Sequence, residues 1–326
     1  MLAVVSEKHP YFDIGGFPLI FKRKRDKFMK KPDRTFQYVC EILEKADSSK
    51  YPELLQKWCR IYGNGRINSI EDPKSFNEKI QWLKLYDSTP LKTLCADKYL
   101  VREWLKEKIG DEYLVPLIGV WDRFDDIDFE TLPKQFALKC NHGSGWNCIV
   151  EDKSKLDIKH TKVLFDGWMK RNYAFVGLEL HYKHISPKII AEEYLGNEPI
   201  KDYRFYCFNG EPKQVWVDLY SGTKKHIRSI FDMEWNKVAL KCTWPDGGEL
   251  LSQKPQNFEK MIDLSRILSK DFCFVRVDFF EIMGKLYMGE MTFTPMNGQG
   301  IFEPFEWDYK LGEMIELPKE KYIFRD

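Results

Sequence analysis

The sequence lacks the features that would place it in several simple classes of protein. Its 51 basic and 50 acidic residues almost balance, so it has no surplus charge of one sign to recruit nucleic acid or an anionic lipid surface. No apolar stretch approaches the roughly 20 residues that a membrane-spanning helix needs. The chain also has no internal repeat and no low-complexity segment. We therefore expect a compact protein with no nucleic-acid partner and no stable membrane insertion.

Cysteine occurs eight times, but never in a pair suited to a metal or a redox reaction. The sequence has no C-x-x-C motif and no zinc-like spacing of cysteine with histidine. This pattern predicts reduced thiols, most of them buried. The first residues, MLAVVSEKHPYFDIGG, show no basic leader before an apolar core and no small-residue cleavage site. The expected compartment is therefore the cytoplasm.

The secondary-structure signals change from helix to strand along the chain. Residues 1–90 are expected to be mainly helical, and S-F-N-E at 75–78 predicts a capping box that opens a helix. Asp97 is predicted to cap a second helix, which ends at Gly110. Strands and helices alternate over 113–195, and strand signals dominate from residue 202, with a hairpin around Asn209-Gly210 and a helix over 257–268. We therefore predict an α+β protein with mixed sheets.

The segment over 271–300 predicts a hairpin that brings two acids together. Its two halves are rich in aromatic and β-branched residues, and Gly284 marks the turn. A three-residue loop over 283–285 would place Asp278 directly opposite Glu290. A two-residue turn would instead shift the register by one and send the two side chains to opposite faces. Both alternatives remain open on the hairpin alone.

Opposed carboxylates need something to offset their repulsion, because like charges directly across a ladder are destabilising. A hard divalent cation such as Mg²⁺ takes one or two carboxylates and completes its shell with water and phosphate. Arg276 lies two residues before Asp278 and should project to the same face of its strand. It could form an ordinary salt bridge or bind a phosphoryl group in transfer.

A glycine-rich loop forms the second cluster, in the phrase FALKCNHGSGWNCIV. Gly143-Ser144-Gly145 follows one predicted strand and precedes another, so its backbone N–H groups could fold over a phosphate. Lys139 could add a positive charge to the same phosphates. The loop is not a Walker motif, and such a sequence in isolation is usually only a turn. His142 is a candidate phosphate ligand, but it is more simply read as a side chain that stabilises the turn.

A third cluster lies at the end of the predicted strand IIAEEYL. Glu192 and the backbone of the residues after it could present hydrogen-bonding groups to a planar base, or the acids could be ordinary exposed strand-end residues. Asp202-Tyr203-Arg204 places an opposite-charge pair at the start of the next strand. That pair could be a surface ion pair of little energy, or it could contact a ribose and a phosphate.

The order of these parts is more specific than any one of them. The phrases that matter are Lys98 in ADK, Lys139 with NHGSG, Glu192 in IIAEEYL, Asp202 and Arg204 in KDYRFY, Arg276 and Asp278 in VRVDF, and Glu290 in GEMTFTP. Together they resemble the ATP-grasp superfamily over roughly residues 90–300. More narrowly, PKSFNEKIQWLKLYD, ADKYLVREWL, NHGSGWN and KIIAEEYL resemble the TupA-like ATP-grasp proteins, which are encoded among surface-polysaccharide genes.

The resemblance implies an ATP-grasp fold, in which two α+β lobes grip ATP. It divides the chain into a mainly helical N-terminal region over 1–90, an N-terminal lobe with a glycine-loop lid over 91–195, and a C-terminal lobe with a metal site over 196–326. The implied site residues are Lys98 and Lys139 on the ATP phosphates; His142, Gly143, Ser144 and Gly145 over the terminal phosphate; Glu192, Glu193, Tyr194 and Leu195 at adenine; Asp202 or Glu198 at the ribose, with Arg204 nearby; and Asp278, Glu290 and Thr292 on Mg²⁺, with Arg276 and Lys139 as catalytic cations.

One position departs from the superfamily pattern. The superfamily commonly has E-x-N at the second metal position, whereas this chain has Glu290-Met291-Thr292. A hydroxyl binds a metal or its water only weakly, so a second Mg²⁺ is the least secure part of the implied site.

The function implied by the resemblance is an ATP-dependent carboxylate–amine ligase that works through an acyl phosphate. The implied carboxylate is a uronic acid of a cell-surface polysaccharide or its precursor, such as a sugar nucleotide, and the implied partner is an amino acid or small amine. One alternative is a glycosyltransferase, but D-D-I-D at 125–128 lies in a predicted loop without the Rossmann-like strands that such enzymes show. A nucleotide-binding module without activity is the other alternative. Trp146, beside the glycine loop, is the aromatic residue best placed by sequence to contact a sugar.

Overall fold

The computed structural model describes residues 34–62, 67, 69–196 and 199–323. The expectations for the amino-terminal leader and for Glu198 lie outside these residues. The α-helices are α2 (Arg34–Lys45), α3 (Tyr51–Tyr62), α4 (Phe76–Tyr86), α5 (Pro90–Ala96), α6 (Val101–Ile109), α7 (Ile158–Met169), α8 (Phe258–Ser269) and α9 (Glu306–Glu313). None of the helices in this part of the chain is both long and apolar enough to traverse a bilayer.

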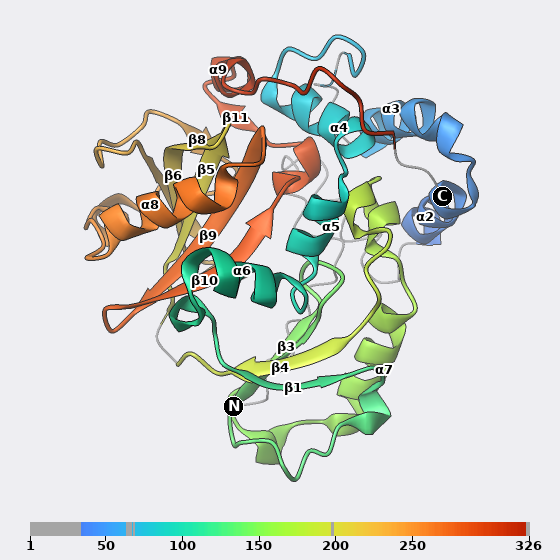
Figure 1. Cartoon of the computed structure of the whole chain (residues 1–326), viewed down its shortest axis with the longest axis vertical. Helices are drawn as coiled ribbons and strands as arrows, with labels where there is room; N and C mark the ends of the chain where they lie inside the picture. The colour runs from blue at the N-terminus through green and yellow to red at the C-terminus, as the bar shows by residue number, and fades with distance from the viewer. Residues whose placement is uncertain (1–33, 63–66, 68, 197–198, 324–326) are drawn as a thin grey trace.

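The strands of the described residues form two large antiparallel sheets, which lie apart in Figure 1. The four-stranded sheet has the order β1-β4-β2-β3 and the five-stranded sheet the order β10-β9-β5-β6-β7; β11 and β8 form a small pair. Their bounds are β1 Leu117–Trp121, β2 Phe136–Cys140, β3 Asn147–Val150, β4 Ile189–Glu193, β5 Asp202–Phe208, β6 Glu211–Leu219, β7 Ile227–Phe231, β8 Lys241–Cys242, β9 Phe274–Ile282, β10 Lys285–Thr292 and β11 Phe302–Glu303. The expected α+β class is confirmed, but the two large sheets are antiparallel throughout, so the prediction of mixed sheets is wrong.

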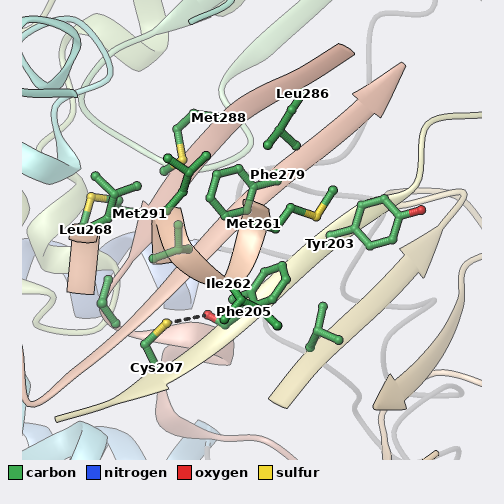
Figure 2. Close-up of a cluster of buried hydrophobic side chains, with 14 of the residues drawn as sticks. Tyr203, Phe205, Cys207, Met261, Ile262, Leu268, Phe279, Leu286, Met288 and Met291 are labelled. Carbon is green, nitrogen blue, oxygen red and sulfur yellow. Dashed lines mark hydrogen bonds between the residues drawn. The ribbon is translucent and has the colours of Figure 1, made fainter. Parts of the chain in front are cut away.

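One face of the five-stranded sheet is apolar and packs on α8. Alternate residues of β5 and β9, among them Phe205 and Phe279, are fully buried on this side. Figure 2 shows them pointing toward Met261 and Ile262 of α8. Such alternation is what a strand with one buried face requires, because successive side chains point to opposite sides. This core fixes the sheet and leaves its other face for polar residues.

The other face of the same sheet carries charged side chains at its centre and aromatic side chains at one end. Tyr206 stacks on Trp216, with ring centroids 4.1 Å apart, and both belong to the cluster around Phe76 of α4. The predicted capping box opens α4, since the Ser75 side chain accepts a hydrogen bond from the N–H of Glu78. α4 thereby joins the N-terminal helices to the end of the charged row.

The two hairpins of the five-stranded sheet both turn in two residues. Asn209-Gly210 connects β5 and β6 with positive φ at both positions, as the sequence predicts. Met283-Gly284 does the same between β9 and β10 (φ 51° and 76°), so the predicted three-residue loop is wrong. Ile282 pairs with Lys285 rather than with Leu286.

A β-bulge at Gly289 nevertheless restores the predicted partnership. Met288 pairs with Phe279, and the next pair along the ladder is Glu290 with Asp278. The unpaired residue moves the ladder by one position. Met288 therefore stays on the apolar face, while Glu290 and Asp278 share the polar face. The predicted pairing of Asp278 with Glu290 is confirmed, but it depends on a bulge that the sequence analysis did not predict.

The glycine loop connects β2 and β3 of the four-stranded sheet, as predicted, and α7 packs behind it. The helix predicted to begin after Asp97 begins later, at Val101. Asp97 instead accepts hydrogen bonds from the N–H groups of Tyr99 and Leu100, which holds a turn around Lys98. Gly110 ends α6 with φ 97°, as expected. All eight cysteines are free thiols, and most are buried.

Candidate active site

The centre of the site is a row of charged side chains on the polar face of the five-stranded sheet. Asp278 lies between Glu290 of β10 and Arg204 of β5 in the ladder. Arg276 donates from Nε and Nη2 to the two oxygens of Asp278 (2.7 and 2.6 Å) and from Nη2 to Glu290 Oε1 (2.9 Å). Arg276 therefore acts at least as the salt bridge that the sequence allowed. Its Nη1 makes no hydrogen bond within the described residues and is free to contact an anion.

The row continues across β5, β6 and β7. Arg204 pairs with Asp202 (2.9 Å) and with the fully buried Asp218 (2.7 Å). Arg228 holds both oxygens of Asp218 at 2.5 and 2.7 Å. Burial opposes ionisation of Asp218, but the two guanidinium charges outweigh it and hold its pKa well below the usual range.

The pKa values of the two opposed acids are shifted in opposite directions. Burial raises the pKa of Asp278 to about 6, although Arg276 and Arg204 act against that shift. Burial also opposes ionisation of Glu290, but Arg276 and Lys98 outweigh it, so the pKa of Glu290 lies below its ordinary value. The Glu290 side chain is 38% exposed and the Asp278 side chain 5% exposed. Glu290 is thus the more readily ionised and the more accessible member of the pair.

These residues suit a hard cation. The row holds four carboxylates (Asp202, Asp218, Asp278, Glu290) and three guanidinium groups (Arg204, Arg228, Arg276), which leaves one negative charge in excess. Thr292 adds a hydroxyl 3.1 Å from Glu290 Oε1. In the part of the chain described, no group of three or more His, Cys, Asp and Glu side chains could hold a metal. A metal here would therefore need oxygens from a bound phosphate as well, which is the usual habit of Mg²⁺.

The glycine loop is tied to the turn before α6. Lys98 Nζ donates to the carbonyl of Gly143 (2.6 Å), and the Lys98 N–H donates to Asn141 O (3.1 Å). Burial lowers the pKa of Lys98, while the nearby Glu290 acts in the opposite direction. Lys98 therefore lies between the loop and the acidic hairpin, which are far apart in sequence. That is the position required of a phosphate-binding cation.

The tip of the glycine loop is accessible to solvent. Gly145 is exposed with φ 72°, and Ser144 is partly exposed. A Cβ on Gly143 would come within 2.6 Å of the Trp146 ring, so that position needs glycine for packing. Trp146 is 2% exposed and lies in the lid core, and the prediction that it contacts a sugar is therefore wrong.

The buried His142 ring is held next to the glycine loop by two contacts. Its ring nitrogens lie 3.2 Å from Asn141 Oδ1 and 3.2 Å from the carbonyl of Trp168. Burial lowers the pKa of His142 to about 4, so the imidazole is neutral at physiological pH. This arrangement favours the turn-stabilising role over a charged phosphate ligand. A neutral imidazole carries a single N–H, so it donates to one of these two oxygens, and both ring nitrogens face groups of the protein.

Lys139 and the strand-end acid form an ion pair on the four-stranded sheet. Lys139 Nζ lies 2.6 Å from Glu192 Oε2, and Arg102 of α6 donates to Glu192 Oε1 (3.0 Å). Glu192 is buried, whereas Glu193 is exposed. Both oxygens of Glu192 are thus occupied by cations in this structure. Sequence reasoning did not single out Arg102, although it lies in the phrase ADKYLVREWL.

The other residues predicted to contact adenine, Tyr194 and Leu195, follow β4 in the chain. Tyr194 and Leu195 are partly buried at the end of that strand, on the chain segment that leads to β5. Asp202 Oδ2 accepts from Ser221 (2.6 Å) as well as from Arg204. The predicted adenine and ribose residues therefore lie at the end of β4, directly after it, and at the start of β5.

A small cavity joins the loop to the acidic hairpin. Ser144 lines one side and Arg276, Glu290 and Thr292 another. The structure thus brings together the loop and the metal-site candidates, which are more than 130 residues apart in the printed sequence. The rest of the wall includes Glu179, which the sequence analysis did not identify. Its only signal was a single acid in the apolar run AFVGLEL.

Comparison with known proteins gives one match to a family model. The model described as TupA-like ATPgrasp matches residues 78–316, which is most of the chain. No curated protein matches the sequence.

Solved structures give weaker likenesses. D-alanine--D-alanine ligase from Bacillus anthracis is 18% identical, with a TM-score of 0.44, over 68% of this chain and 66% of that chain. ATP-grasp ligase PsnB complexed with minimal precursor is 10% identical (TM-score 0.36; 71% and 59%), and L-amino acid ligase from Bacillus licheniformis is 10% identical (TM-score 0.35; 81% and 56%). The chain thus spans less than two thirds of the length of each of these ligases. Because these likenesses are low, the assignment below depends on the family model.

Proposed function

This chain belongs to the TupA-like ATP-grasp family, and from that premise we propose that it is an ATP-dependent carboxylate–amine ligase. The observation that supports the proposal best is that Ser144 of the glycine loop, Arg276 and Glu290 line one cavity, while Lys98 contacts the loop and Asp278 pairs with Arg276. ATP would bind between the four-stranded and five-stranded sheets. Lys98 and Lys139 would contact its phosphates, and residues 143–145 would cover the terminal phosphate.

The residues present fit Mg²⁺, as their oxygen donors and excess negative charge indicate. Asp278 and Glu290 would hold it, with Thr292 as a weak additional donor, and the ion would neutralise charge on the phosphates. Arg276 would stabilise the transferring phosphoryl group through its free Nη1. Neither Ser/His/Asp nor Cys/His chemistry is needed, because the phosphoryl group passes directly to the substrate carboxylate.

The products of the two steps are an acyl phosphate and then an amide. We propose a uronic acid of a surface polysaccharide, or its sugar-nucleotide precursor, as the carboxylate, and an amino acid or small amine as the nucleophile. We also propose that the enzyme acts in the cytoplasm. Lys139 and Glu192, now paired at 2.6 Å, would separate or shift when phosphate and adenine enter between them.

Trapping the acyl phosphate tests this proposal. Purified protein is incubated with ATP, Mg²⁺, hydroxylamine and either glucuronate or UDP-glucuronate, and the hydroxamate and ADP are measured. The proposal predicts hydroxamate with one of these acids, and none with the Glu290→Gln variant. ADP release without hydroxamate, or glycosyl transfer from a sugar nucleotide without ATP, would contradict it.

The amine is then found by replacing hydroxylamine with glycine, L-alanine, L-glutamate or ethanolamine. ADP release that depends on both the acid and one of these amines is the expected result. The glycosyltransferase alternative predicts no dependence on ATP, and a binding module without activity predicts no turnover at all.

A further inference from the structure

The cavity between the glycine loop and the acidic hairpin has a wall that the nucleotide site does not explain. Beyond Ser144, Arg276 and Glu290, it is lined by Glu179, Tyr182 and residues 294–297. The cavity is small, about 60 Å³. It therefore suits one functional group of a second substrate rather than a nucleotide.

Glu179 is a buried acid with unused hydrogen-bonding capacity. It is 6% exposed, and its Oε2 accepts a hydrogen bond from the Thr294 hydroxyl. Its Oε1 makes no hydrogen bond within the described part of the chain. This oxygen is not among the fully buried atoms without a partner, so it can accept a hydrogen bond from water or from a ligand in the cavity. Glu179 thus presents an open acceptor to the cavity.

The neighbouring cations are already committed to other partners. Lys84 of α4 is fully buried, and its Nζ donates to Gln81 Oε1 (2.9 Å), Gly177 O (3.1 Å) and Asn297 O (2.8 Å). An ammonium group has three donors, so Lys84 has none left for a ligand. Its charge offsets part of the charge on Glu179 from a distance.

The other charged groups on the wall leave the cavity with negative character. Arg276 is shared between Asp278 and Glu290. Tyr182 lies near Glu179 and Glu290, whose charges together with burial raise its pKa, so its hydroxyl stays neutral. The two carboxylates on the wall, Glu179 and Glu290, outnumber the single guanidinium group, so the part of the cavity beside Glu179 favours a cationic group.

The segment that carries Thr294 is held in a strained form. Met296 and Asn297 both have positive φ (53° and 54°), and Gln81 Nε2 binds the carbonyls of Asn297 and Gly298 at 2.8 and 2.9 Å. Non-glycine residues in this conformation cost energy and persist where the surroundings require them. The consequence is a fixed Thr294 hydroxyl that orients Glu179.

We propose that Glu179 binds the ammonium group of the amine substrate and accepts its proton beside the activated carboxylate. This inference rests on the proposed ligase function. The ammonium gives one proton to a Glu179 oxygen, and the freed nitrogen lone pair forms a C–N bond to the acyl carbon. The C–O bond to phosphate breaks, its electron pair leaves with inorganic phosphate, and the second N–H proton passes to phosphate or solvent.

A comparison of two nucleophiles tests this role. Hydroxylamine is already neutral at neutral pH, whereas an amino acid or ethanolamine is an ammonium ion that must lose a proton. The Glu179→Gln variant keeps the acceptor for Thr294 but loses the charge. We expect it to slow the amine reaction by roughly 10²-fold, the usual contribution of a general base, and to change hydroxamate formation much less.

Asp308→Asn is the matched control. Asp308 is also a buried acid (2% exposed), but it accepts hydrogen bonds from Asn77 in the contact between α4 and α9. We expect it to leave the ratio of the amine rate to the hydroxamate rate unchanged. Equal slowing of both reactions in Glu179→Gln would assign Glu179 a structural role and overturn the proposal. Absence of hydroxamate with the wild-type protein would instead contradict the ligase function.

A second measurement does not depend on turnover. Ethanolamine is titrated calorimetrically into protein saturated with ADP and Mg²⁺. The proposal predicts binding to the wild type and to Asp308→Asn, and binding to Glu179→Gln that is weaker by roughly tenfold, since a charged hydrogen bond contributes about 1.5–3 kcal/mol. Equal affinity for all three proteins, or no binding to any of them, would overturn it.

Discussion

At the scale of single residues, the central observation is that two opposed carboxylates have unequal environments. Asp278 is buried and held at both oxygens by Arg276, whereas Glu290 is partly exposed and close to Lys98. A divalent cation could approach Glu290 directly, and it would have to share Asp278 with Arg276. The two acids should therefore respond differently to the loss of their charge.

We predict that Glu290→Gln abolishes turnover with little change in stability. Asp278→Asn should also abolish turnover, but it removes the buried carboxylate that accepts from both Nε and Nη2 of Arg276, and breaking a buried pair typically costs about 3–5 kcal/mol. Urea denaturation of both variants measures the difference. Equal stability of the two would show that the Arg276–Asp278 pair is not buried as described.

The buried His142 makes the stability of the lid sensitive to acid. Its pKa is lowered from 6.5 to about 4 in the folded protein, mainly by burial, so the unfolded chain binds more protons between these values. Stability from this group is therefore complete above pH 6.5 and is lost as the pH falls toward 4. The loss amounts to about 3 kcal/mol at most.

The test is the difference between two denaturation series over that pH range. The wild type should lose more stability toward acid than His142→Gln, which cannot be protonated. The other acids and bases contribute equally to both proteins. An equal loss of stability toward acid in the two proteins would mean that the His142 ring is solvated and available to bind a phosphate.

At the scale of elements, the hairpin of β9 and β10 shows how a correct pairing can follow from a wrong turn. Alternation and glycine predicted the hairpin, but Met283 occupies a left-handed position that normally selects Asn or Gly. The bulge at Gly289 then moved the register back. A bulge depends on both faces of the sheet: Met288 must reach the apolar core and Glu290 the polar row. Periodicity within one strand could not predict it.

The turn gives a stability prediction that is independent of function. Met283 is fully exposed with φ 51°, so its side chain loses no contacts on replacement. Met283→Asn should stabilise the protein by about 0.5–1 kcal/mol, because Asn tolerates the left-handed region. Thermal unfolding without ligand measures the effect. Destabilisation would contradict a two-residue turn with positive φ at both positions.

The glycine loop shows the same limit of sequence reasoning. Its place between two strands and the company of Lys139 could be predicted from local pattern. The burial of Trp146 and the pairing of Glu192 with Arg102 could not, because both depend on α6 and α7 packing against the lid sheet. Glu179 was missed for a similar reason, since its partners come from segments more than 90 residues away.

At the scale of the whole molecule, α4 connects the N-terminal helices to the five-stranded sheet and to the segments around Gly177 and Asn297. Lys84 joins this helix to Gly177 and to Asn297, and its side chain also lies over the Trp58 ring at 5.3 Å. These are three separate parts of the chain. Helices α3 and α4 are therefore part of the scaffold that shapes the cavity.

We predict that Lys84→Met destabilises the protein by about 3 kcal/mol or more, because several buried carbonyl groups lose their donor. Burial lowers the pKa of Lys84 to about 8, which shows that burying the charged ammonium group already costs the native protein some stability. Urea denaturation measures the change, with Lys57→Met on the exposed face of α3 as the control. Similar stability for the two variants would show that α4 is peripheral.

The measurement that tests the central claim most directly is the thermal shift of the protein with ATP, ADP and UDP, each with and without Mg²⁺. A ligand in hundredfold excess over its dissociation constant stabilises the folded state by about 2.7 kcal/mol, which moves the melting temperature visibly. We predict a Mg²⁺-dependent shift with the adenine nucleotides that Glu290→Gln loses. A shift with UDP alone, or no shift with any nucleotide, would contradict the account.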